Sequence, residues 1–255
     1  MVPGKIRISL SQKTKFYLFT FYGCIVMRKL LLALIGALAL SSAAHAQGAN
    51  WSGFTAGISG GFGSGSAGQN LPPALITEEV VITDHKYGLS GGVLGLGGAY
   101  DMQTGPWVYG VLFDYSWANI DGLMTVTTCA PLGCGVELRS FGTLRGRIGY
   151  AYGTWLPYIT GGLAFGNVHA FNNNIPASGS QTHVGWTLGV GIATKFAPNW
   201  SAKLEYLYAD LGKKDHYFVA PGIPEAVGVR TNIVRVGIDY HFAPVAPAPA
   251  PLYRK

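Results

Sequence analysis

Eight stretches of this chain alternate apolar and polar residues, and this period of two constrains the fold more than any other feature. Successive side chains of a β-strand point to opposite faces, so the alternation predicts strands with one apolar face. The last stretch, Val234-Arg235-Val236-Gly237-Ile238-Asp239-Tyr240-His241-Phe242, shows the pattern over nine residues. The predicted strands are 51–63, 86–100, 107–118, 137–150, 157–168, 182–196, 200–210 and 229–242.

The segments between these strands alternate in length. Four are long, with 22, 18, 13 and 18 residues, and they are 64–85, 119–136, 169–181 and 211–228. Three are short, with 6, 6 and 3 residues, and they are 101–106, 151–156 and 197–199. Long outer loops and short periplasmic turns are typical of bacterial outer-membrane barrels, whereas a soluble β-sandwich gives no reason for this alternation.

The beginning of the chain has the layout of a secretory leader. A short basic segment, Met27-Arg28-Lys29, precedes an eleven-residue apolar core at 30–40, and Ala44-His45-Ala46 is a small-x-small cleavage site. The core is about half the roughly twenty residues that a spanning helix needs. We predict a signal peptide at 27–46 and a start codon assigned too early for 1–26, with an extended basic region as the alternative.

The formal charge of +6 comes entirely from residues 1–46, which hold six of the eighteen Lys and Arg residues and no Asp or Glu. The rest of the chain therefore has twelve basic and twelve acidic side chains. The basic balance of the whole sequence is no sign of nucleic-acid binding, and we predict no nucleic-acid partner.

The apolar faces of the predicted strands are too aromatic and too continuous for a barrel interior. They carry aromatic residues near strand ends, among them Trp51, Trp107, Trp117 and Trp200, as in the two aromatic girdles of membrane proteins. Only helices and closed barrels satisfy every backbone group inside a bilayer. We therefore predict an all-β, eight-stranded antiparallel up-and-down transmembrane β-barrel at 47–242, in the Gram-negative outer membrane, with both termini periplasmic.

The opposite faces of the strands carry charged residues, which we predict to line the lumen. Eight strands enclose an interior just wide enough for side chains to fill. The predicted network has five basic and four acidic members: Arg139, Arg145, Arg147, Lys203, Arg235, Asp114, Glu137, Glu205 and Asp239. Near balance of charge in a narrow barrel favours a plugged lumen and a structural protein. A narrow passive channel is the alternative.

Cys129 and Cys134 are the cysteines that remain after the leader. An even pair in an oxidising compartment is most simply a disulfide that closes a tight loop. A structural zinc site needs about four ligands, so two cysteines alone do not predict one.

Other motifs fail on inspection. Residues 63–68 match the Gly-x-Gly-x-x-Gly/Ala dinucleotide fingerprint, but 69–73 contains Pro72 and Pro73 and offers no helix, so we predict an outer loop there. The histidines are predicted in loops or near strand ends, without a metal-binding spacing. Ser90 and His183 are the candidate pair for a lipid-modifying hydrolase, but no carboxylate is placed to orient them. We predict no catalytic residue, no metal and no cofactor.

Four segments resemble one family. Trp51-Ser52-Gly53-Phe54-Thr55-Ala56-Gly57 is similar to the opening of the small alphaproteobacterial outer-membrane surface antigens, a porin-like family with OmpA-like barrels. Residues 142–150, 157–166 and 232–242 are similar to strands of the same family. The resemblance covers about 50–242. It implies a barrel that serves outer-membrane integrity and exposes its loops as surface antigens.

The resemblance also implies partners. The polar, glycine and aromatic positions Arg235, Gly237, Tyr240 and Phe242 fit the C-terminal signal that the barrel-assembly machinery reads. The chain departs from the family in its Pro/Ala-rich tail at 243–255, which leaves open whether the signal works internally. A Pro/Ala alternation favours extended polyproline II, so the tail is either a disordered periplasmic extension or a contact with the cell wall. Outer-membrane lipid and lipopolysaccharide are the other expected partners.

Overall fold

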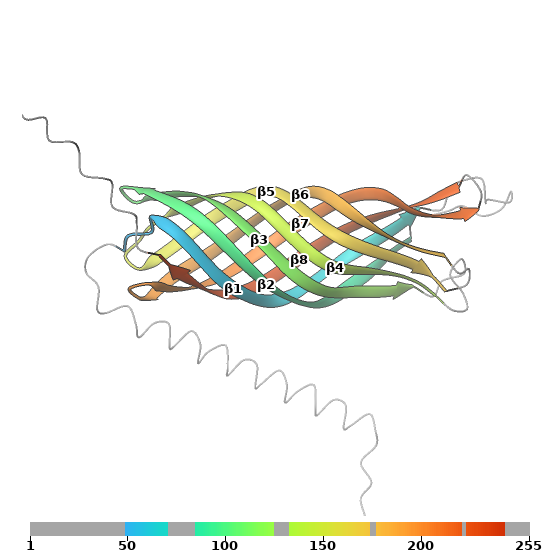
Figure 1. Cartoon of the computed structure of the whole chain (residues 1–255), viewed down its shortest axis with the longest axis horizontal. Helices are drawn as coiled ribbons and strands as arrows, with labels where there is room; N and C mark the ends of the chain where they lie inside the picture. The colour runs from blue at the N-terminus through green and yellow to red at the C-terminus, as the bar shows by residue number, and fades with distance from the viewer. Residues whose placement is uncertain (1–48, 71–84, 125–132, 174–176, 221–222, 243–255) are drawn as a thin grey trace, which may run out of the picture. The chain divides into compact units, whose positions relative to one another are not determined.

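A computed structural model describes residues 49–70, 85–124, 133–173, 177–220 and 223–242 of the chain. These residues form eight strands: β1 (Gly53–Asn70), β2 (His85–Thr104), β3 (Trp107–Met124), β4 (Cys134–Tyr150), β5 (Trp155–Asn172), β6 (Ala177–Ala197), β7 (Trp200–Ala220) and β8 (Ile223–His241). Each strand pairs antiparallel with its sequence neighbours, and β1 pairs with β8 to close the barrel (Figure 1). The predicted fold class is confirmed. Among the described residues, no helix is long and apolar enough to cross a membrane.

The two ends of the barrel differ. At the turn end, short connections join β2 to β3, β4 to β5 and β6 to β7, and β1 begins beside the last residues of β8 (Figure 1). At the loop end, the connections include 71–84, 125–132, 174–176 and 221–222, which lie outside the described residues. The strands run further toward the loop end than predicted. β1 continues to Asn70 and β7 to Ala220, so much of each predicted long loop is strand.

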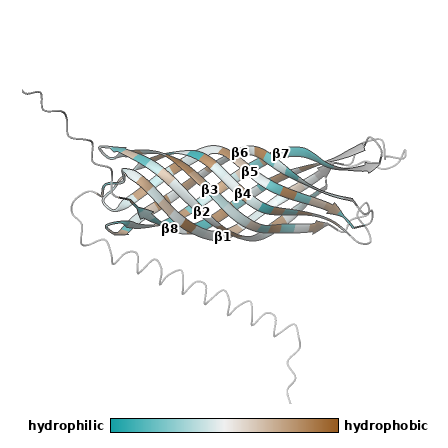
Figure 2. Ribbon diagram, in the orientation of Figure 1, coloured by the Kyte–Doolittle hydropathy of each residue, from teal (hydrophilic) through white to brown (hydrophobic). Residues whose placement is uncertain are grey.

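The turn-end half of the barrel has an apolar outer face. Hydrophobic and hydrophilic residues alternate along its strands (Figure 2), and the outward members are exposed hydrophobic side chains. Trp107, Trp200 and Tyr150 lie toward the turn end of this band, and Trp117 and Trp186 toward the loop end. Between them the band contains Ile58, Leu94, Leu96, Val111, Phe113, Leu144, Ile148, Ile159, Leu163, Leu188, Val190, Leu204, Tyr206, Val234, Val236 and Ile238.

The loop-end half reverses this arrangement. Its outward residues are largely polar and exposed, including Lys86, Ser90, Asp121, Arg139, Thr182, Lys214 and Arg230. Its interior is an apolar core of Ala67, Leu89, Val93, Ile120, Val136, Leu138, Phe141, Ala164, Val168, Ala170, Leu207, Ala209, Leu211, Val227, Val229 and Ile233. This half is therefore built like a soluble protein, with its apolar side chains inside.

The barrel is taller than its apolar band. The strands have 17 to 21 residues, which at about 3.3 Å per residue gives roughly 55–70 Å along a strand. A tilt of about 40° leaves about 42–54 Å along the barrel axis, roughly twice the height of a typical apolar band of about 25 Å. The loop-end half therefore extends well beyond the band.

Candidate functional site

Four buried charged side chains form a closed ring inside the turn-end half. Arg145 of β4 contacts Asp114 of β3 at 2.8 Å and Glu205 of β7 at 3.0 Å. Arg235 of β8 contacts Asp114 at 2.8 Å and Glu205 at 2.6 Å. Acids and bases alternate around the ring, so each charge has two opposite neighbours. We call these four residues the charged ring.

Neighbouring hydroxyls complete the hydrogen bonding of the charged ring. Thr143 donates to Asp114 at 2.6 Å and accepts from Nε of Arg145 at 2.8 Å, while the Tyr158 hydroxyl donates to Glu205 at 3.2 Å. The side chains of the ring are between 1% and 8% exposed. Burying charges is costly unless they are paired and hydrogen-bonded, and both conditions are met here.

Two further pairs lie closer to the turn end. Arg147 donates to both carboxylate oxygens of Asp101, and its guanidinium carbon lies 5.1 Å from the centre of the Tyr158 ring. Lys203 contacts Asp239 at 2.8 Å. Together with the charged ring, they place four basic and four acidic groups in this half of the interior.

Asp101 is the network member that sequence reasoning missed. We predicted it in a turn because the second strand was taken to end at Tyr100, but β2 continues to Thr104 and Asp101 is fully buried. Two signals in the sequence point to it. Asp101 continues the inward row of Gly97 and Ala99, and the predicted network had one more base than acid.

Glu137 and Arg139 do not belong to the network, and the prediction that they line the lumen is wrong. They contact each other on the outer surface at 2.9 Å, with side chains 38% and 53% exposed. The pairing register of β4 shifts around Arg139 relative to both β3 and β5. This irregularity reverses which positions point inward, so Leu138 and Phe141 are both buried.

Little space remains among the charged side chains. The cavity beside Asp114, Arg145 and Arg235 has a volume of about 20 Å³, room for about one water molecule. Small inward residues make this packing possible, because a Cβ at Gly57 would collide with the Asp239 carboxylate and one at Gly61 with the backbone of β8. The apolar core fills the interior on the loop side of the ring.

Trp51 closes the interior at the turn end. It is 1% exposed, and its backbone N–H donates to the side chain of Gln103 at 2.8 Å. His241 meets its ring edge-on at 5.5 Å, and the Lys195 ammonium lies 5.3 Å from the ring centre. We expected Trp51 in the aromatic girdle, but β1 begins only at Gly53 and the preceding segment turns inward.

A family model and curated relatives agree with this architecture. The model of the outer membrane protein beta-barrel domain matches residues 30–242. The chain belongs to the outer-membrane β-barrel protein family. The family match confirms the resemblance to outer-membrane surface antigens that we inferred from the sequence, and it confirms the predicted location in the outer membrane. The apolar band of this family member is accordingly its membrane-spanning part.

Two relatives show the similarity in detail. A 31 kDa outer-membrane immunogenic protein of Brucella melitensis is 37% identical over 169 residues, which are 57% of this chain and 70% of the relative. A 22 kDa outer membrane protein of Rhizobium leguminosarum bv. viciae is 30% identical over 195 residues, covering 76% and 79% of the two chains. Among solved structures, OprG from Pseudomonas aeruginosa is 15% identical with a TM-score of 0.47, over 76% of this chain and 99% of that one.

The other predicted sites of this family member lie at its two ends. Cys134 is disulfide-bonded at the loop end, but Cys129 lies outside the described residues, so their pairing stays a prediction. The predicted assembly signal forms the end of β8, where the Tyr240 ring packs 5.1 Å from both Trp200 and Phe242. The Phe242 N–H donates to Phe54 of β1 at 2.9 Å, which joins the last strand to the first. The leader at 27–46 and the tail at 243–255 lie outside the described residues.

The candidate hydrolase pair is not assembled. Ser90 is exposed on the outer face of β2, whereas His183 points into the interior from β6. The predicted outer loop at 63–68 is part of β1 and pairs with β2 and β8. The fingerprint glycines therefore lie in a strand and not in a loop that precedes a helix.

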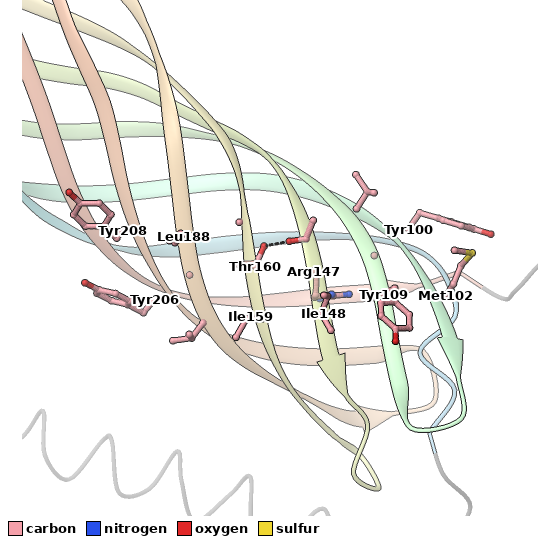
Figure 3. A pocket seen from close by; sticks show the side chains of 16 residues that line it. Tyr100, Met102, Tyr109, Arg147, Ile148, Ile159, Thr160, Leu188, Tyr206 and Tyr208 are labelled. Atoms are coloured by element: carbon pink, nitrogen blue, oxygen red, sulfur yellow. Dashed lines mark hydrogen bonds between the residues drawn. The ribbon is translucent and has the colours of Figure 1, made fainter.

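A groove of about 820 Å³ runs over the outer face of the membrane-spanning part. Its floor includes Gly146 and Gly161, which are cross-strand partners in β4 and β5. Figure 3 shows Tyr109, Ile159 and Tyr206 along it. These side chains belong to the apolar band.

Proposed function

We propose that the protein is a structural outer-membrane barrel with a closed lumen, and that it contributes to the integrity of the outer membrane. The observation that carries this proposal is the charged ring, which joins β3, β4, β7 and β8 across the interior. A passive channel needs a continuous water path. The cavity of about 20 Å³ beside the ring argues against such a path.

Planar-bilayer recording of the purified protein tests the proposal. We expect the wild type to pass almost no current, because salt-bridged side chains occupy the centre of the barrel. The Arg230→Ala variant is a matched control, since Arg230 and Asp210 pair on the outer surface, and it should behave as the wild type. Large, steady single-channel currents from the wild type would favour a narrow porin-like channel instead.

A structural role also predicts a cellular phenotype. Deleting the gene should make the cells more permeable to detergents and to large antibiotics. Expression of the wild-type barrel from a plasmid should restore resistance. The Ser90→Ala variant should restore it equally well, because we propose that the protein is not an enzyme. Failure of Ser90→Ala alone to complement would revive the lipid-modifying hydrolase.

We further propose that the turn end and both termini face the periplasm, and that the loop end faces outward. Short turns on the periplasmic side are the rule for bacterial barrels. The Brucella relatives carry the description immunogenic, which supports surface exposure of the loop end here. Protease treatment of intact cells should cut the loop-end connections and leave a tag on the C-terminal tail untouched.

The proposed partners follow from this placement. Outer-membrane lipid contacts the apolar band, and lipopolysaccharide meets its outer edge. We propose that the barrel-assembly machinery reads Arg235, Gly237, Tyr240 and Phe242, and that the tail at 243–255 is either a disordered periplasmic extension or a contact with the cell wall. Phe242→Ala should lower the amount of inserted barrel in fractionated membranes more than deletion of 243–255 does. Equal loss in both variants would assign the tail a role in assembly.

A further inference from the structure

The β6–β7 boundary changes character at the loop end. The register between these strands runs from the turn end up to Trp186 and Asp210. Beyond that point β6 continues with β5 as far as Ala177, and β7 continues with β8 as far as Ala220. Among the described residues, the ladder pairing of β6 with β7 ends there, but the strands stay close, since a Cβ at Gly179 would collide with the carbonyl oxygen of His216. We call the facing segments, 177–185 of β6 and 211–216 of β7, the seam.

Side chains connect the two sides of the seam. Nζ of Lys214 donates to the Thr182 carbonyl at 2.9 Å. Nδ1 of His183 lies 3.2 Å from the Leu211 carbonyl oxygen, and Nδ1 of His216 lies 3.1 Å from that of Gly179. His183 is fully buried and His216 is nearly so. Our expectation that the histidines lie only in loops or near strand ends is therefore wrong for this pair.

The two imidazole rings meet through their other nitrogens. Nε2 of His183 lies 2.8 Å from Nε2 of His216. A carbonyl oxygen only accepts hydrogen bonds, so each Nδ1 must carry a proton and donate it. In neutral rings, both Nε2 atoms would then present lone pairs to each other at hydrogen-bond distance. That contact is repulsive unless a cation lies between them.

The geometry identifies the cation. The ring centres are 5.1 Å apart, the separation of two imidazoles that meet end to end with their lone pairs in line. A metal ion bonded to both nitrogens along this line at about 2.0–2.1 Å would need them about 4 Å apart. Within the described residues, no group of three or more His, Cys, Asp and Glu could hold a metal ion. A proton fits the 2.8 Å separation.

We propose that His183 and His216 share one proton and so form a pH-dependent latch across the seam. The singly protonated pair has an N–H⁺···N hydrogen bond that holds β6 against β7. Loss of that proton leaves two opposed lone pairs, and gain of a second leaves two opposed positive charges. The latch is therefore closed only between two limits of pH.

The surroundings set where those limits lie. Burial, and then the other imidazole, lower the pKa of His183, and burial lowers that of His216. Lys214 of β7 also opposes protonation of both rings, as does His169 of β5 for His216, while Asp215 of β7 favours it for His216. On the β8 side, Arg230 is paired with Asp210 at the base of the seam. Burial and the neighbouring positive groups therefore lower the pKa of both rings relative to an exposed histidine.

Imidazole nitrogen NMR of the full barrel in lipid nanodiscs tests the shared proton directly. With ¹⁵N-labelled histidine, we expect two rings that keep Nδ1 protonated over the closed range and whose Nε2 signals shift together on titration. His183→Phe retains an aromatic ring without the nitrogens, and it should abolish the shift of the His216 signal. His169→Phe should keep the two signals shifting together and only move their titration slightly toward higher pH, because His169 opposes protonation of His216. Independent titration of the two rings would overturn the proposal.

Distance measurement tests the latch itself. Spin labels at positions 178 and 213, on the two sides of the seam, should come closest at mildly acidic pH and separate on either side of it. In the His183→Phe barrel, this minimum should disappear. A separation that does not vary with pH in the wild type, or one that changes only on adding a metal chelator, would contradict the shared proton.

Discussion

The two halves of the barrel interior are filled with opposite chemistry. The turn-end half holds paired charges around Arg145 and Glu205 and only a small apolar cluster with Trp51 at its end, whereas the loop-end half holds an apolar core around Leu138 and Phe141. The outer faces are reversed as well: the outer face is apolar in the turn-end half and polar in the loop-end half. The same eight strands are therefore suited to lipid along one half of their length and to water along the other. Where lipid surrounds the wall, the polar groups turn inward and pair, and beyond the lipid the wall follows the rule for soluble proteins.

We expect the largest loss of stability when one charge is removed from the turn-end half. Glu205→Ala leaves Arg145 and Arg235 without one of their two carboxylates, in a place with little room for water. Loss of one partner from a buried ionic cluster costs about 3–5 kcal/mol. Urea unfolding in lipid vesicles should show this loss of stability. Planar-bilayer recording of the same variant should show a rise in conductance.

The exposed pair provides the control for this experiment. Arg230→Ala removes a charge whose side chain is 59% exposed, and such surface pairs contribute at most about 1 kcal/mol. Equal destabilisation by Glu205→Ala and Arg230→Ala would mean that burial of the charged ring contributes nothing special.

The loop-end half should respond to volume instead of charge. Leu138 is completely buried in the apolar core, and Leu→Ala changes in such positions cost about 2–5 kcal/mol. Leu123→Ala is the matched control, because Leu123 lies on the outer face and is 58% exposed. Its effect should stay within about 0.5 kcal/mol. Similar midpoints for the two variants in urea would argue that this half is loosely packed.

An arginine introduced on the outer face should lower stability where lipid surrounds the barrel and have little effect where water does. Val236→Arg places a charge on the lipid-facing side of β8, which costs about 2–4 kcal/mol near the middle of the membrane. Ser90→Arg places the same charge on the outward side of β2 in the loop-end half, and there we expect almost no change. Vesicle unfolding curves report both values. A large penalty for Ser90→Arg would move the membrane boundary toward the loop end.

The smallest expected effect concerns the disulfide at the loop end. A short loop closed by Cys129 and Cys134 should contribute about 2 kcal/mol. Cys129→Ser and Cys134→Ser should each lose that amount, and the double variant should lose no more. Thiol labelling of intact cells should find no free cysteine without reductant. Ready labelling of the wild type would exclude this pairing.

The sequence was sufficient to predict the barrel, its strand count and most of the interior charges, because alternation with a lipid-facing apolar side is a strong local signal. Arg145, Arg147 and Glu205 stand in that regular pattern. The same rule failed beyond the membrane, where the apolar side turns inward and we ended β1 and β7 too early. It also failed at Glu137 and Arg139, since the irregularity at Arg139 reverses the inward phase. That reversal depends on the pairing of β4 with both neighbours, which no single strand reveals.

The charged ring has a consequence for how the chain folds. Arg235 contacts Asp114, which is 121 residues away in sequence, and the two residues lie on β8 and β3. Such a contact forms only after the intervening strands are in register and β8 has joined β1. Before closure, the β3–β4 and β7–β8 hairpins each hold one ring pair, Asp114 with Arg145 and Glu205 with Arg235. Each charge gains its second partner only when the two hairpins meet across the closed barrel. We therefore expect the ring to stabilise the closed barrel over an open one, because two of its four ion pairs exist only after closure.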